Sequence, residues 1–577
     1  MRVSVKWAGV GLGLAVAFSA GAYPWPIARD SVATLMNSAL APFGGLKWAS
    51  GEAYLTLLPW PTLQLVGVDI VDGAGKNKIS ATSAEVALRL QPLAHGRFAP
   101  RGAKLLNPTA VIDLDAPGGG APEPLAPVLM LGLIEIHGGV VKIVSARRHF
   151  DTLVEIVDGR LNWADVVHPL SFSLSGVWRG QPVAVAGALE APLMIVQGQG
   201  SGASLEITSP PIDLAFSGRW SPGGRDEFDG DFTARLRSLD ELDRWLGVAL
   251  APPPVAAQDV VLQAKAEGDL DAFALSEARL VIGGQELDGS LNFARADGKL
   301  AASGTLAAES LDLGALLGPF PAPLDAQGQW SDKPFLAAPS DTLDLDLRVS
   351  ATHTTWGGHA MEDAALGLVQ REGSLTAKLL EAVAYQGALT GEISVRRVGD
   401  GCETKASLSL DNADIGALLG DWGVTSYSGR GKFEATLQAS GGSPAQIVAS
   451  ARGGAKIDLE SGIVTGLNFE EALRRSQRRP LDLARGLMTG QTKFDSAQAR
   501  LDVSNGVARI AEARTQGPGA SLEVQGAIDF AAREWNARIV ATQASGVGAP
   551  SIDAARLTIS VLGPWAAPIL SAVVGTD

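Results

Sequence analysis

An Asn-Gly pair, Asn505-Gly506, lies between two runs in which apolar and polar residues alternate. Asn-Gly is a strong signal for a β-hairpin, because a type I′ turn needs positive φ at both central residues. A two-residue turn fixes the cross-strand pairs, which we list as Ser504 with Val507, Val503 with Ala508, Asp502 with Arg509, and Leu501 with Ile510. One face of this hairpin is therefore expected to be apolar.

The same alternation continues beyond this hairpin and recurs in the middle of the chain. Ser521–Phe530 places Leu522, Val524 and Ile528 on one side. A second hairpin is expected at Glu372-Gly373, and strict alternation runs through Thr342–Val349. These segments add an apolar set that consists of Leu343, Leu345, Leu347, Val349, Leu366, Leu368, Leu375 and Leu379. Half-buried antiparallel strands are typical of such a pattern.

Further turns and short helices are expected between the strands. Asp158-Gly159 and Asp297-Gly298 have the same acidic-Gly form as Glu372-Gly373. Three segments share an aspartate at the third position and a closing glycine, as in short capped helices, namely Ser238–Gly247, Ser310–Gly318 and Asn412–Gly420. Asn468–Leu487 is a longer, locally basic helical candidate. The sequence therefore predicts a mainly β fold, an elongated curled antiparallel sheet with short interspersed helices.

The charge of the chain argues against nucleic acid as a partner, and its cysteine content excludes an intramolecular disulfide. Charged residues make up only 19% of the chain, the net charge is −15 and the pI is about 5.0. A phosphate-binding surface needs clustered Lys and Arg, so nucleic acid is not an expected partner. With a single cysteine, Cys402, the chain cannot form an intramolecular disulfide, and its cysteine content gives no indication of the compartment.

The amino terminus has the composition of a membrane segment. Arg2 and Lys6 precede an uncharged run of 22 residues from Trp7 to Ala28, which is long enough to span a bilayer as a helix. Tyr23 and Trp25 fall where interfacial aromatic residues belong. We therefore expect one N-terminal transmembrane helix, with the body of the chain exported.

A cleaved signal peptide is the alternative interpretation of this segment. Ala20-Gly21-Ala22 has the small-x-small form of a cleavage site. In both interpretations the basic residues stay in the cytoplasm and the rest of the chain is extracytoplasmic.

No recognisable catalytic or metal motif occurs in the sequence. HExxH, zinc-type Cys/His spacing, GxSxG and the P-loop pattern are all missing. His353 and His359 with Glu362 and Asp363 form the one local set that resembles metal ligands, and a solvated loop is the better interpretation. Cys402 is expected to be an inert thiol in a loop. We therefore expect neither an enzyme, nor a cofactor, nor a metal site.

Three groups of segments together resemble the AsmA family of Gram-negative envelope proteins. The first is the anchor with Leu57-Leu58-Pro59 and the run LQLVGVDIVD at Leu63–Asp72. The second is Gln91–Leu114, with Pro92, Leu93, Gly96 and Pro108, followed by the DG-x-x-NW pattern at Asp158–Trp163. The third is Gly454–Phe530, with Ser461-Gly462-Ile463, Gly466, Thr492-Lys493-Phe494 and Asn505-Gly506-Val507. The resemblance is clear at both ends and weak between about 200 and 430.

The resemblance implies an inner-membrane protein whose single span precedes a periplasmic body. AsmA-like proteins are similar to the larger chorein-type bridge-like lipid transfer proteins, in which a long curled sheet forms an apolar groove for lipid acyl chains. The family is associated with phospholipid movement to the outer membrane and with outer-membrane protein assembly. On this basis we expect an anchor at 1–28, an AsmA-like β region at 29–200, a variable β-groove region at 201–450 and an AsmA-like β region at 451–577.

The alternating strands also pose a physical problem that the groove would solve. A flat meander would expose far more apolar area than a soluble surface tolerates. Curling the apolar face around lipid tails removes it from water, and so would packing two sheets into a dry sandwich. Since the resemblance favours the groove, the groove candidates are the apolar residues named above, namely Leu343, Leu345, Leu347, Val349, Leu366, Leu368, Leu375, Leu379, Leu501, Val503, Ile510, Leu522, Val524 and Ile528.

Two functions are expected to compete. The leading one is a membrane-tethered protein that conducts phospholipid between the inner and outer membranes and so supports outer-membrane biogenesis. The alternative is a scaffolding or assembly factor that engages outer-membrane proteins through sheet edges without moving lipid. Phospholipid acyl chains, the inner membrane and an outer-membrane protein are the partners that these hypotheses imply.

Overall fold

The computed structural model describes most of the chain. The described residues are 18–19, 21–40, 47–71, 77–94, 100–113, 132–146, 150–163, 168–196, 198–222, 227–247, 258–296, 299–317, 329–333, 343–356, 359–399, 401–421, 427–478, 487, 490–543, 556–564 and 568–574. The chain divides into two compact units, and each is described by itself. The first comprises Met1–Val248, Ala257–Val281 and Ser290–Gly298, and the second comprises Ala249–Ala256, Ile282–Gly289 and Lys299–Asp577.

In its described residues, the first unit consists mainly of strands with short helices between them. Its elements are β1 (Trp25–Pro26), α2 (Arg29–Leu40), β2 (Lys47–Thr56), β3 (Thr62–Val71), β4 (Lys78–Leu88), α3 (Leu90–Ala94), β5 (Pro100–Asp113), β6 (Gly132–Ser145), β7 (Phe150–Trp163), β8 (Leu170–Trp178), β9 (Gln181–Leu189), α4 (Pro192–Val196), β10 (Ser201–Ser209), β11 (Ile212–Ser221), β12 (Glu227–Leu236), α5 (Leu239–Leu246) and β13 (Val260–Gly268). β14 (Ala272–Ile282) and β15 (Gln285–Ala296) contribute residues to both units.

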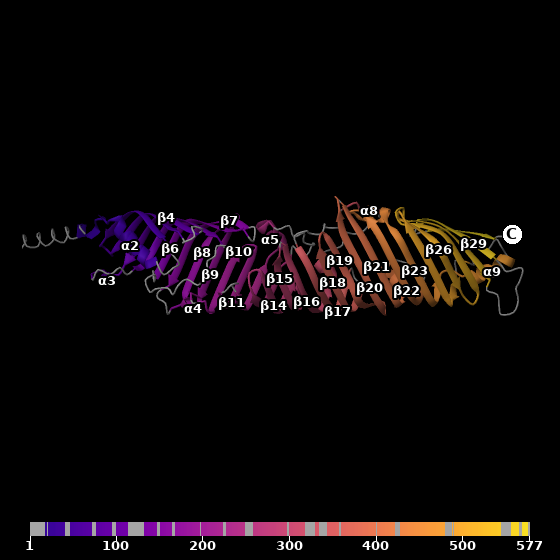
Figure 1. The fold of residues 1–577 in the computed structure, drawn as a ribbon. Coiled ribbons are helices and arrows are strands. Elements are labelled where there is room, and N and C mark those ends of the chain that lie inside the picture. Colours follow the sequence, from indigo (N-terminus) through magenta and orange to yellow (C-terminus); the bar gives the residue numbers. More distant parts are fainter. Residues whose placement is uncertain are drawn as a thin grey trace, which may run out of the picture. The chain divides into compact units, whose positions relative to one another are not determined.

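The second unit repeats this construction. Its elements are β16 (Lys299–Asp312), α6 (Leu313–Leu317), β17 (Leu343–Trp356), β18 (His359–Arg371), β19 (Ser374–Ala384), β20 (Gly387–Val398), β21 (Gly401–Asp414), α7 (Ile415–Asp421), β22 (Tyr427–Ser440), α8 (Pro444–Ser450), β23 (Arg452–Thr465), α9 (Phe469–Arg478), β24 (Gln491–Phe494), β25 (Ser496–Ser504), β26 (Val507–Gln516), β27 (Ala520–Asp529), β28 (Glu534–Gln543), β29 (Arg556–Pro564) and β30 (Ile569–Val574). In both units neighbouring strands lie side by side, and short helices such as α4 and α8 lie at strand ends (Figure 1). The predicted mainly β fold is confirmed.

Alternating side chains explain why these segments form a sheet. In β8, Leu170, Phe172 and Leu174 are half-buried on one face, while the serines between them are exposed on the other. This period of two is the repeat of a strand whose successive side chains point to opposite faces. β8 pairs antiparallel with β9, and β9 with β10, so the alternation carries across the sheet.

The two predicted hairpin turns are present. Asn505 and Gly506 have φ of 51° and 77°, as a type I′ turn requires. The β25–β26 register contains all four predicted pairs. Glu372 and Gly373, with φ of 48° and 67°, likewise join β18 to β19.

The sheet is not purely antiparallel. β5 pairs parallel with β6 in the first unit, and β16 pairs parallel with β17 in the second. Parallel neighbours need a crossover of a dozen or more residues, and the chain supplies 114–131 and 313–342 at these two places. The antiparallel prediction therefore holds for the other strand registers of the described residues.

Glycines allow the backbones of neighbouring strands to approach closely in both units. Gly218 of β11 lies opposite Gly230 of β12, and a Cβ built on Gly218 would lie 2.5 Å from the Cα of Gly230. Such close approach of two strands needs residues without side chains. In the second unit, Gly453 has φ of 142°, and a Cβ there would lie 2.0 Å from the carbonyl oxygen of Thr436.

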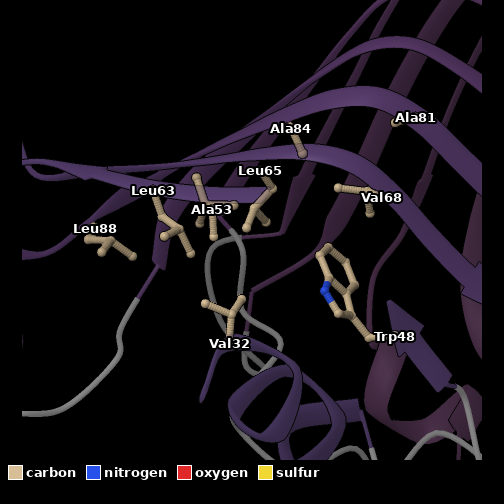
Figure 2. Close-up of a cluster of buried hydrophobic side chains, with 10 residues drawn as sticks. Val32, Trp48, Ala53, Leu63, Leu65, Val68, Ala81, Ala84 and Leu88 are labelled. Atoms are coloured by element: carbon tan, nitrogen blue, oxygen red, sulfur yellow. The ribbon is translucent and has the colours of Figure 1, made fainter. Parts of the chain in front are cut away.

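A helix covers the amino-terminal end of the first unit's sheet. α2 places Val32 against the side of the sheet that carries Ala53, Leu63 and Leu65, and Trp48 completes the cluster (Figure 2). Leu65 is fully buried. These strands therefore have an ordinary hydrophobic core, in which a helix shields one face of the sheet.

The turn predicted at Asp158-Gly159 and the loop predicted around Cys402 are wrong. Asp158-Gly159 lies inside β7, where Asp158 pairs with His137. A Cβ on Gly159 would lie 2.7 Å from Leu174 Cδ2, so this glycine provides space for packing instead of forming a turn. Cys402 is buried in β21 and is not in a loop. Asp297-Gly298 lies outside the described residues.

The predicted anchor at 1–28 is described only from residue 18 onward, apart from residue 20. Tyr23 and Trp25 are exposed there, and their rings meet edge to face at 5.3 Å. Within the described ranges, no helix combines the length and the hydrophobicity that crossing a bilayer needs.

Candidate functional site

Two rows of apolar side chains cross the sheet of the second unit from strand to strand. The first row runs through Gly304, Leu347, Leu368, Ala377, Ile393, Ala406, Leu437, Gly453, Val503, Ala508, Ile528, Trp535 and Gly563. The second runs through Leu306, Val349, Leu366, Leu379, Gly391, Leu408, Ala435, Ala455, Leu501, Ile510, Gly526, Ala537, Val561 and Leu570. Neither row contains a charged residue, and we call the side of the sheet that carries them the apolar face.

All fourteen predicted groove residues lie on the apolar face. Nine belong to the two rows, and the other five share their parity on the same strands: Leu343, Leu345, Leu375, Leu522 and Val524. Register therefore places on one face side chains that are up to 185 residues apart in the sequence, as from Leu343 to Ile528.

The opposite face of the same sheet carries ion pairs. Arg371 lies 3.2 Å from Asp346, and Lys378 lies 3.6 Å from Glu392. Arg396 donates to Glu403 at 2.6 Å, and this hydrogen bond, followed by one from Gln438, lowers the pKa of the Glu403 carboxyl. Cross-strand pairs of opposite charge stabilise a solvated sheet face. The two faces are thus chemically distinct.

One border of the apolar face is lined by short helices, and we call it the helix border. α6 begins after Asp312, whose side chain accepts hydrogen bonds from the backbone N–H groups of Gly314 and Ala315 at 2.8 and 3.1 Å. Asp414 caps α7 in the same way, by accepting from Ala417 N–H at 3.0 Å. The predicted helix caps are therefore confirmed at these two positions.

These helices bury the sheet beneath them. Ile415 and Leu418 of α7 pack against Leu410 and Ala413 of β21, all with little or no exposure. Leu313 of α6 packs against a cluster that consists of Met361, Ala364, Ala382 and Ala384. The helix border is therefore a conventional core.

The other border carries the turns Glu372-Gly373 and Asn505-Gly506, and we call it the hairpin border. Val395, Thr404 and Ala439 are buried along it. The N–H of Ala445 in α8 donates to Ser331 O at 3.1 Å, and the indole N–H of Trp330 donates to Phe530 O at 2.6 Å. Side chains near this border are therefore also shielded from water.

Between the two borders the apolar face stays open. Ile393, Leu408 and Leu437 are 41%, 39% and 36% exposed, although each is a large apolar residue in one of the two rows. They lie on the consecutive strands β20, β21 and β22. The sequence prediction missed all three, although the alternation in Ser407-Leu408-Ser409-Leu410 is the signal that would have found Leu408.

Not every predicted groove residue is available to a ligand. Val503 is buried beside Ala508, which has no exposed surface. Leu522 is buried in a cluster with Phe469 and Leu473 of α9. The other twelve predicted residues are half-buried on the apolar face.

A tyrosine lies on the apolar face near the helix border. Tyr427 of β22 stacks on Phe494 of β24, with ring centroids 5.7 Å apart. Burial, with the charge of Asp414 as the smaller cause, raises the pKa of Tyr427 to about 12. The phenol therefore stays neutral at physiological pH and adds no charge to the face.

The first unit also has an apolar face, and its lining is partly aromatic. One row runs through Leu55, Leu63, Val86, Ala103, Ile134, Leu161, Phe172, Gly187, Leu205, Phe216, Phe232 and Ala264. Beside it, Phe216 and Phe228 lie 5.8 Å apart and Phe273 and Phe293 lie 5.1 Å apart between ring centroids. Leu205 is 38% exposed.

The histidine cluster from the sequence lies on strands and not in a loop. His353 of β17 pairs with Glu362 of β18, and both are exposed. In the part of the chain that the structure describes, no three His, Cys, Asp or Glu side chains are grouped so that they could hold a metal ion.

The comparison with protein families returned one match. The model of the AsmA family matches residues 324–513, which include β17–β25, most of β26 and the exposed residues Ile393, Leu408 and Leu437. No curated protein and no solved structure matches the chain. The matched range includes much of the stretch between 200 and 430 in which the sequence resemblance is weak, whereas Leu63–Asp72, Gln91–Leu114 and Asp158–Trp163 lie outside it. Residues 324–513 are thus similar to the AsmA family, the family that the sequence resembles.

Proposed function

We propose that this protein is a non-enzymatic envelope protein that carries phospholipid between the inner and outer membranes, with the acyl chains lying on its apolar face. The observation that supports this most is the exposure of Ile393, Leu408 and Leu437 within rows that contain no charge. Contiguous exposed apolar side chains are a mark of binding sites for apolar partners. The family match and the family's association with lipid movement support the same function.

The chemistry of the face suits hydrocarbon chains. Side chains two residues apart along a strand lie about 7 Å apart, so the two rows form a strip along which a chain can lie across many strands. Each methylene that leaves water contributes about 0.8 kcal/mol, so affinity accumulates without any specific pocket. Selectivity for one acyl chain over another is expected to be low.

The composition of the amino terminus supports a proposal for the location of the protein. We propose that residues 1–28 anchor the chain in the inner membrane and that the sheet lies in the periplasm. The exposed pair Tyr23 and Trp25 supports this, because aromatic rings with a polar edge favour the membrane interface.

Adjacent residues on opposite faces give a matched test. Leu437 faces the apolar side, and its neighbour Thr436 is exposed on the opposite side. Lipid that co-purifies with the full chain in mild detergent is measured by mass spectrometry for the wild type, Leu437→Asp and Thr436→Asp. We expect phospholipid on the wild type and on Thr436→Asp, and a loss of several-fold on Leu437→Asp, because a carboxylate is costly to bury against hydrocarbon.

Two outcomes would contradict the proposal. One is a wild-type protein that carries no phospholipid, and the other is a Leu437→Asp variant that retains as much as Thr436→Asp. Thermal unfolding of both variants checks that the fold is kept, since both positions are partly or largely open to water.

A second candidate function is favoured by one edge of the sheet. In the described residues, β30 pairs with β29 alone, and its sequence ILSAVV contains neither charge nor proline. Edge strands are usually protected by charge, proline or short length, as in β1, which consists of Trp25 and Pro26 only. An outer-membrane protein strand could add to β30 by β-augmentation. This scaffold function predicts that Ser571→Pro impairs outer-membrane assembly more than Leu437→Asp does.

A further inference from the structure

Helix α9 lies on the apolar face near its carboxy-terminal end. The helix follows β23 and precedes β24 in the chain, yet it packs on β27, β28 and β29. Phe469, Ala472 and Leu473 have 3%, 0% and 1% exposure. They pack against sheet residues of the apolar face, which are Ala520, Leu522, Ala541, Leu557 and Ile559. α9 therefore occupies positions that are equivalent to the open positions further along the same face.

Directional hydrogen bonds hold one end of this helix. Asn468 caps it by accepting from Glu471 N–H at 2.9 Å. The hydroxyl of Thr492 accepts from Phe469 N–H at 3.0 Å and donates to Leu467 O at 2.7 Å. The backbone N–H of Asn468 donates to Leu487 O at 2.9 Å. The amino-terminal end of α9 is thus tied to the segment that leads into β24.

The body of the helix is held differently. Its buried side chains are apolar, and hydrophobic contact is non-directional and proportional to the area removed from water. A hydrocarbon chain can therefore replace Phe469 and Leu473 on the sheet without leaving a polar group unpaired. The outward side carries Glu471, whose carboxylate binds both Arg474 and Arg475 on the helix surface.

We propose that α9 is a lid that occupies the carboxy-terminal end of the apolar face in place of lipid, and that lipid passes this end only when α9 lifts from the sheet. The inference rests on the proposed function, because it assigns to α9 the control of lipid movement along the same face. Thr492 and Asn468 act as the hinge, and Phe469, Ala472 and Leu473 are the surface that separates.

Thiol labelling reports directly on whether the lid opens. In full-length protein with Cys402→Ser, a cysteine at Ala541 lies beneath α9, and a cysteine at Ala364 lies beneath α6 as the matched control. Maleimide labelling is measured with and without vesicles of phosphatidylethanolamine and phosphatidylglycerol. We expect vesicles to raise the labelling rate several-fold at position 541 and to leave position 364 unchanged. Equal labelling rates at position 541 with and without vesicles would overturn the proposal that α9 is a lid.

A second variant tests the consequence for transfer. Leu473→Ala removes apolar contact between α9 and the sheet while leaving the hinge in place. Transfer of a fluorescent phospholipid from loaded protein to acceptor vesicles is expected to become several-fold faster, with the amount of lipid bound per protein unchanged. Unchanged or slower transfer would contradict the proposal.

The two proposals fail in different ways. A wild-type protein without co-purified phospholipid rejects the proposed function. The lid proposal alone is rejected if the protein carries phospholipid, vesicles do not change the labelling rate at position 541, and Leu473→Ala does not change the transfer rate.

Discussion

The middle of the apolar face and its carboxy-terminal end have the same sequence pattern but differ in their exposure to water. Leu408 in β21 and Leu557 in β29 both alternate with polar residues, and both point to the same side of the sheet. Leu557 has no exposed surface because α9 packs on its strand, whereas Leu408 is 39% exposed. Alternation alone therefore produces an apolar face, and a covering helix decides whether that face is a core or a site.

This difference in exposure indicates which side chains of the sheet serve folding stability and which are available for binding. Side chains under α9, α7 and α6 hold the borders of the sheet in place. Side chains in the open middle contribute less to folding and remain available to an apolar ligand. Substitutions at equivalent register positions should therefore have unequal effects on stability and on lipid binding.

The largest expected effect is on stability at the covered end. Leu557→Ala should destabilise the second unit by about 2–5 kcal/mol, because it removes a fully buried side chain and leaves a cavity beneath α9. Leu408→Ala, on a half-open position, should cost about 1 kcal/mol or less. Urea unfolding followed by tryptophan fluorescence measures both.

The proposed difference between the covered end and the open middle of the apolar face is contradicted if the two variants unfold at the same urea concentration. Equal losses would mean that the middle of the face is also covered in solution, and the open strip would then be no candidate site. The intermediate variant Val561→Ala, in the same strand as Leu557, gives a further point between the two.

A smaller effect is expected at the hinge of α9. Thr492→Val keeps the shape of the side chain but removes both hydrogen bonds that the hydroxyl makes to Leu467 and Phe469. A buried amide left without a partner costs about 1–3 kcal/mol. Hydrogen exchange should accelerate in α9 and not in β20–β22. Uniform acceleration would show that α9 and the middle of the sheet open as one unit.

The hairpins and helix caps were predictable because their signals are local. Asn505-Gly506 fixes the register of β25 and β26 through backbone dihedral preference alone, and Asp312 and Asp414 precede helices that they cap. The same holds for the fourteen apolar candidates, whose placement on one face follows from the period of two.

Burial on that face was not predictable from these patterns. Leu522 is covered by Phe469 and Leu473, about 50 residues earlier in the chain, and the sequence around Leu522 contains no signal that predicts this contact. Asp158-Gly159 failed as a turn for a similar reason, since Gly159 is needed where Ile136 and Leu174 of neighbouring strands approach. Contacts between distant segments decide both cases, and a single sequence does not encode them in any local signal.

The smallest expected effect concerns the polar face and separates it from the apolar one. The pKa of Glu403 is lowered by hydrogen bonds from Arg396 first and Gln438 second. A lowered pKa in the folded state stabilises the fold above the ordinary value of 4.5, and that contribution is lost as the pH falls through the lower folded value. The melting temperature of Glu403→Gln should therefore lie slightly below that of the wild type at pH 7, and the gap should close as the pH falls below 4.5. Because Glu403 lies on the opposite face from Leu437, co-purified phospholipid should be unchanged, and a loss of lipid in this variant would show that the two faces do not act independently.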